Sequence, residues 1–183
     1  MVEILIRHAR KEDCPALARV LIDATRDAFR GRVPDRCLQW LTPEESAANW
    51  AKNFRTEQSF GEGETLLVAE SGASGVVGLA LLGETDKVDP DIAARYAHEL
   101  RSLQVNPAWQ RQGVGRRLLA RVGREVRRKG ATHLLVAVLA ENPNRAFYEH
   151  LGAVQLGARP YVWEGYETEE ILYGWNDVQR QLT

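Results

Sequence analysis

The sequence has few of the residues and segments that mark specialised classes of protein. Its two cysteines, Cys14 and Cys37, lie in no CxxC or Cys/His spacing, which disfavours a disulfide scaffold and a zinc site. No segment approaches the ~20 consecutive apolar residues of a membrane-spanning helix, and the first apolar run is too short for a signal peptide. We therefore expect a cytoplasmic protein without a metal.

A strong charge of either sign is also lacking. The formal net charge is −1, with 44% apolar and 27% charged residues, which is typical of a globular protein and gives no overall basic field for nucleic acid. The length of 183 residues suits one domain, and we see no internal repeat or linker. We expect a single domain over residues 1–183.

The first half of the chain predicts a strand, two helices and a hairpin. Residues 3–9 are typical of a strand, and apolar residues at helical spacing follow over 13–29. A second helix begins at Thr42, Pro43 and Glu45, which match an N-cap, a first helical residue and a capping box. Residues 65–70 and 75–82 read as an antiparallel hairpin, and residues 83–96 as a polar loop.

The second half predicts strands that alternate with helices. Residues 97–105 and 133–140 read as strands, separated by a helix that ends before Gly130. A short helix, with Asn142 as its expected N-cap, ends at Gly152, and two further strands flank a turn at residues 164–165. These elements predict a mixed α/β sheet covered by helices.

Two closely spaced glycines, Gly113 and Gly115, stand where the helix begins. Glycines allow backbone amides to approach a ligand, and the first turn of a helix has unpaired amides and a partial positive charge. Together they predict a phosphate-binding loop. Leu118 occupies the place of the third glycine of the dinucleotide fingerprint, and the Gly-Lys-Ser/Thr of a P-loop is absent.

The loop sequence Gln-Arg-Gln-Gly-Val-Gly, residues 110–115, resembles the Gln/Arg-x-x-Gly-x-Gly/Ala signature of the GNAT-fold N-acetyltransferase superfamily. The segment "ENPNRAFYEHLGA" resembles the second signature of that family, in the expected order. The resemblance implies the GNAT fold, a mostly antiparallel twisted sheet flanked by helices, with acetyl-CoA held near the strand–loop–helix of residues 103–119. It also implies acyltransferase activity toward an amine of a small molecule or protein, and it leaves a homodimer open.

The resemblance further implies a set of cofactor-binding residues. Loop amides would bind the pyrophosphate, the backbone of the preceding strand would bind the pantetheine arm, and arginines would meet phosphates. An asparagine of the second signature would also contact the cofactor. The residues are Leu103, Val105, Arg111, Gln112, Gly113, Val114, Gly115, Arg116 and Asn142, with Arg117 as a further candidate. An ordinary helix N-terminus with a solvated basic face is the alternative.

Two residues are candidates for acid–base catalysis. Tyr148 matches the general-acid position of the family, and a phenol with a pKa near 10 keeps a proton to give to a leaving thiolate. A lysine-like amine is mostly protonated at pH 7, and Glu99 is the candidate base, with His98 as the alternative. Strand alternation places these two on opposite faces, and a packing role remains open for all three.

The acceptor is expected between the first two helices and the last hairpin, and the candidate lining residues are Asp35, Trp40, Trp163, Glu164 and Tyr166. Three other functions remain open: a non-catalytic acyl-CoA-binding module, a transferase for another acyl group, and a nucleic-acid-binding domain that uses the basic helix. The neutral net charge disfavours the last of these.

Overall fold

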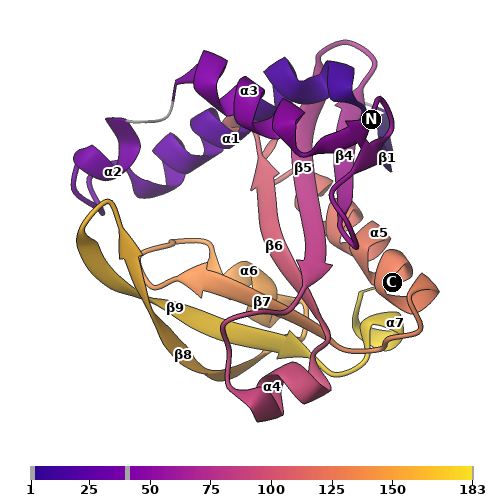
Figure 1. Cartoon of the computed structure of the whole chain (residues 1–183), viewed down its shortest axis with the longest axis vertical. Coiled ribbons are helices and arrows are strands. Elements are labelled where there is room, and N and C mark those ends of the chain that lie inside the picture. The colour runs from indigo at the N-terminus through magenta and orange to yellow at the C-terminus, as the bar shows by residue number, and fades with distance from the viewer. Residues whose placement is uncertain (1–2, 40–41, 183) are drawn as a thin grey trace.

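In the computed structural model, which describes residues 3–39 and 42–182, seven strands form one sheet (Figure 1). Their order across the sheet is β1-β4-β5-β6-β7-β9-β8. The strands are β1 (Ile4–His8), β4 (Thr65–Ser71), β5 (Gly75–Glu84), β6 (His98–Val105), β7 (Leu134–Leu139), β8 (Val154–Trp163) and β9 (Tyr166–Trp175). All neighbours are antiparallel except β6 and β7, which confirms the expected fold class.

Helices cover both faces of this sheet. They are α1 (Cys14–Phe29), α2 (Arg36–Gln39), α3 (Pro43–Lys52), α4 (Pro90–Arg95), α5 (Val114–Arg128), α6 (Arg145–His150) and α7 (Val178–Gln181), with single 3₁₀ turns at η1 (Lys11–Asp13) and η2 (Pro107–Trp109). α1 and α3 lie against one face, whose core holds Leu17, Val68 and Leu79. α5 and α6 pack on the other, where Leu118 and Val122 are fully buried. A small hairpin of β2 (Phe54–Thr56) and β3 (Ser59–Phe60) follows α3.

The sheet opens between its two parallel strands. β6 and β7 pair only at Glu99–Leu135 and Leu100–Val136, and beyond this point they diverge, as Figure 1 shows. Asn106 N donates to Val77 O of β5 at 2.9 Å. Because backbone groups alternate in direction along a strand, those of Leu103 and Val105 face the opened edge.

Two local predictions were wrong, and a third, the start of α3 at Thr42 and Pro43, is confirmed except for one bond of its capping box. Residues 83–96 are not one loop, since β5 extends to Glu84 and the Asp89 side chain caps α4 by accepting from Asp91 N. Asn144 rather than Asn142 is the N-cap of α6. The capping box of α3 is altered, because Thr42 Oγ1 accepts from Glu45 N but the Glu45 carboxylate accepts from that same hydroxyl.

A bulge in β6 also changes the expected alternation. Leu82 lies opposite Leu100 and Leu81 opposite Ser102, so Arg101 is the extra residue. Glu99, Ser102 and Gln104 consequently share the face covered by α1. Among the described residues, no helix combines the length and the apolar character needed to cross a membrane.

Candidate active site

A cleft of about 490 Å³ lies where β6 and β7 diverge. Its walls come from four places: α1, the end of β6, the loop that leads into α5, and the segment of α6 with the residues before it. The volume falls within the ~300–1,000 Å³ usual for small-molecule sites. The cleft therefore brings together parts of the chain that are far apart in sequence.

The glycine loop forms one end of this cleft. Gly113 is the N-cap of α5 with φ = +82°, and a Cβ built there meets no atom within 4 Å. The first bond of the helix runs from Arg117 N to Gly113 O at 3.0 Å, so the amides of the preceding residues are left for a ligand. Gln110 holds the loop by donating to Val105 O at 3.2 Å. The loop therefore has the backbone geometry that an anion site at a helix N-terminus requires.

Gly115 has a different environment. A Cβ at this position would lie 3.4 Å from Cζ of Phe147 and 3.8 Å from Cγ2 of Val105. These are ordinary van der Waals distances, so packing against α6 and β6 does not by itself require a glycine here. Gly115 lines the cleft.

The predicted cationic residues divide between the cleft and other places. Arg111, with φ = +60°, and Arg116 both line the cleft. Arg117 instead donates to the carbonyl of Ile4 on β1. Gln112, predicted with the loop amides, is exposed and donates to Ala108 O at 2.9 Å.

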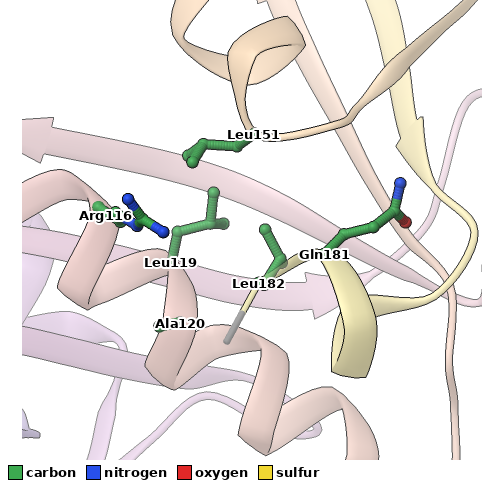
Figure 2. A pocket seen from close by; sticks show the side chains of 6 residues that line it. All are labelled: Arg116, Leu119, Ala120, Leu151, Gln181 and Leu182. Atoms are coloured by element: carbon green, nitrogen blue, oxygen red, sulfur yellow. The ribbon is translucent and has the colours of Figure 1, made fainter.

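Arg116 also borders a second cavity of about 10 Å³, between α5, α6 and the C-terminal segment (Figure 2). Figure 2 shows Leu119 on the next turn of α5, facing Leu151 and Leu182. This volume accommodates about one water molecule. The small cavity cannot hold a cofactor, so the large cleft is the candidate site.

Asn142 and Tyr148 line the opposite wall. The Asn142 side chain accepts from Asn144 N at 2.8 Å, which shapes the turn before α6. Tyr148 is 8% exposed, and its ring contacts Phe147, Tyr173 and Trp175. Burial raises the pKa of Tyr148 to about 12. The phenol therefore keeps its proton at neutral pH, as a general acid must.

Glu99 lies near the point where β6 and β7 separate, on the α1 face, and is 4% exposed. Arg159 on β8 donates to its Oε1 at 3.1 Å, while Oε2 is buried without a hydrogen-bond partner among the described residues. Burial raises the pKa of Glu99, although the charge of Arg159 opposes this. Glu99 is not among the residues that line the cleft. His98, whose pKa is lowered by burial, does not line it either.

The last hairpin packs against α1 and against α2, a helix that the sequence did not predict. Trp163 meets Phe29 edge to face at 5.3 Å, and Cys37 Sγ donates to Trp163 O at 3.3 Å. Arg36 donates to the carbonyls of Glu164 and Gly165 at the turn. Asp35 is exposed near this contact, and Trp40 lies outside the described residues.

Sequence reasoning missed three residues here. Phe29 lines the cleft and anchors the hairpin. Arg159 holds Glu99 and also Glu170, the latter at 2.6 Å. Glu141 accepts hydrogen bonds from Tyr166 and Thr168. No local motif marks them, because each acquires its partners only when distant strands pair.

Comparisons with known proteins agree with this geometry. A profile of the acetyltransferase (GNAT) domain matches residues 62–152, which contain both motifs. The uncharacterized N-acetyltransferase YuaI of Bacillus subtilis is 26% identical over 98% of this chain and 97% of its own.

Solved structures share the fold across nearly the whole chain. The ribosomal-protein-alanine N-acetyltransferase of Brucella melitensis superposes with a TM-score of 0.69, at 26% identity over 93% of this chain and 98% of its own. The structure of yncA from Salmonella typhimurium, solved with its cofactor acetyl-CoA, gives a TM-score of 0.65. It is 24% identical, over 98% of this chain and 94% of its own. The chain belongs to the GNAT family of acetyltransferases.

Proposed function

We propose that this single-domain chain transfers the acetyl group of acetyl-CoA to a primary amine of a small molecule or protein, by direct attack within a ternary complex. The observation that carries the proposal is the cleft, which joins the helix N-terminus at Gly113 to a proton-bearing Tyr148. The acetyl-CoA in the yncA structure supports the choice of cofactor. Both cysteines are buried and neither lines the cleft, which suits direct attack.

The residues fit an extended phosphorylated thioester. Amides of Gln112, Gly113, Val114, Gly115 and Arg116 would hold the pyrophosphate, with Arg111 and Arg116 adding charge. Backbone groups of Leu103 and Val105 at the open edge of β6 would hold the pantetheine arm as an added strand. Asn142 would contact the cofactor from the facing wall.

Two side chains would move protons. Bound acetyl-CoA supplies an activated acetyl thioester. As the acceptor nitrogen bonds to the acetyl carbon and the C–S bond breaks, Tyr148 would give its proton to the departing sulfur. Glu99, whose Oε2 has no hydrogen-bond partner within residues 3–39 and 42–182, would receive the proton of the amine through water. Because burial raises the pKa of Glu99, its carboxylate accepts a proton more readily than the carboxylate of an exposed glutamate does.

A pair of substitutions at Gly113 tests this proposal. Thermal unfolding with acetyl-CoA, CoA or NAD should show a rise in Tm for the two CoA species alone, because a ligand of the folded state stabilises it. Gly113→Glu places a carboxylate at the helix N-terminus and should abolish the shift. Gly113→Ala is the control: its methyl group would meet no atom within 4 Å, so this variant measures only the loss of stability caused by a side chain at a positive φ.

Release of free thiol from acetyl-CoA, followed across a panel of amines, then tests turnover. No Tm shift at saturating acetyl-CoA would reject the acetyltransferase function. A shift without thiol release would favour a non-catalytic acyl-CoA-binding module. A faster reaction with propionyl-CoA or succinyl-CoA would instead identify another acyl group.

A further inference from the structure

Glu141 is a carboxylate held by hydroxyl groups rather than by a cation. Tyr166 donates to its Oε1 at 2.9 Å, and Thr168 donates to both oxygens at 2.7 and 2.8 Å. None of the ion pairs formed by the described residues includes Glu141. Burial opposes ionisation, but the hydrogen bonds, together with the charge of Arg145, outweigh it and hold the pKa of Glu141 below its usual value. Glu141 is therefore a negative charge that is influenced by Arg145 but forms no ion pair within the described part of the chain.

Glu141 does not itself line the cleft, but it lies next to residues that do. The next residue, Asn142, lines the cleft, as does Phe29 of α1. Tyr166, which binds Glu141, packs in the same apolar cluster as Phe29 and Leu139. Glu141 thus lies between the cleft and the last hairpin, on the side expected to receive the acceptor.

Arg145 already acts on Glu141, and two more arginines near this face have other partners. Arg159 donates to Glu99, to Glu170 and to the carbonyls of Asp86 and Lys87. Its charge is thus shared by two carboxylates, and Glu99 still has one buried oxygen without a partner. Arg36 is likewise bound to carbonyls of the hairpin turn. An acceptor that carries a carboxylate would find neither arginine free to bind it.

We propose that Glu141 binds a second, non-reacting cationic group of the acceptor, so that diamine-like amines are preferred and amines with a carboxylate are rejected. This inference rests on the proposed acetyl transfer. The reacting amine must lose its proton, and a carboxylate beside it would strengthen its hold on that proton. An ammonium that does not react gains from Glu141 without this cost.

Three amines of equal length test the inference: 1,6-diaminohexane, hexylamine and 6-aminohexanoate, which differ only in the distal group. Each is titrated by calorimetry into the protein saturated with CoA, and thiol release is measured in parallel with acetyl-CoA. We expect the diamine to bind about tenfold more tightly than hexylamine, as one charge-assisted hydrogen bond provides. We expect 6-aminohexanoate to bind most weakly.

Glu141→Gln should bring the diamine to the level of hexylamine while CoA affinity is unchanged. Glu167→Gln is the matched control. Glu167 is exposed on the opposite face of β9, so this variant removes an equal charge and should leave the preference for the diamine intact. Equal binding of the three amines, no binding of the diamine, or a preference that survives Glu141→Gln would overturn the inference. Loss of CoA binding or of transfer to every amine would instead reject the proposed function.

Discussion

Tyr148→Phe separates the chemistry of the phenol from the packing of its ring. The ring lies against Phe147, Tyr173 and Trp175 with centroid distances of 5.3, 6.4 and 6.1 Å, and phenylalanine retains all of these contacts. The hydroxyl forms no hydrogen bond to the protein in the described structure. Its removal should therefore leave the free energy of unfolding at pH 7 almost unchanged.

The expected loss is in turnover. General acid catalysis contributes roughly 10²–10⁴-fold, which corresponds to about 3–5 kcal/mol of transition-state stabilisation. Steady-state thiol release should show kcat reduced by this factor, whereas the Kd for acetyl-CoA, measured by calorimetry, stays near that of the wild type. A variant with full kcat would refute the role of Tyr148 as the acid. A variant with lost cofactor affinity would indicate a binding role instead.

Tyr148→Phe should also change how the stability of the protein depends on pH above pH 10. The pKa of Tyr148 is raised to about 12 in the folded protein, against about 10 in an unfolded chain. Because the pKa of Tyr148 is higher in the folded protein, the contribution of its neutral phenol to folding stability is fully present below pH 10. That contribution is lost as the pH rises toward 12. The wild type should lose up to ~3 kcal/mol relative to Tyr148→Phe across that window. Parallel denaturation curves at pH 9 and pH 11 should show about half of this loss, and equal losses in the two proteins would show that Tyr148 is not shielded from solvent.

Two further substitutions test the core around the site. Arg159→Met leaves Glu99 and Glu170 without their shared cation and should cost about 3 kcal/mol in urea denaturation at pH 7. Because the raised pKa of Glu99 would rise further, the deficit should shrink toward pH 4, and a constant deficit would contradict this account. Gly174→Ala places a methyl 2.6 Å from the Tyr96 ring and should lower stability by about 1–3 kcal/mol. An unchanged Tm would mean that the ring shifts freely.

The sequence predicted the larger elements because their signals are local. The apolar stripe of Leu118, Leu119, Val122 and Val126 is fully buried on α5. Gly130, with φ = +81°, ends that helix region as expected. Glu164 and Gly165 both have positive φ at the tight turn between β8 and β9. Periodicity and turn chemistry act within a few residues, so they can be read directly.

The errors arose where two local patterns competed. Asn142 precedes a proline and Asn144 follows it, and either asparagine can cap a helix. The structure uses Asn144 as the cap, whereas Asn142 forms the preceding turn. Similarly, the polar sequence after β5 obscured the Asp89–Pro90 start of α4. Only tertiary packing decides between such alternatives.

The candidate site was only partly readable for a related reason. The loop residues Gly113, Val114 and Gly115 line the cleft as predicted, because they are adjacent in sequence. The link between Glu99 and Arg159 spans 60 residues. It exists only because β6, β7, β9 and β8 are neighbours in that order. Strand order and register decide which charges meet, and neither is encoded in a short motif.

The two glycines at the start of α5 are under different physical constraints. Gly113 requires a left-handed backbone and faces open space, so its freedom is conformational and leaves the first-turn amides accessible. Gly115 has ordinary helical geometry but a neighbour, Phe147, at 3.4 Å from the position of a Cβ. At Gly115 a methyl group would make only an ordinary van der Waals contact with Phe147. The physical requirement for glycine in this motif therefore lies at Gly113, where the positive φ leads the chain into the first turn of α5.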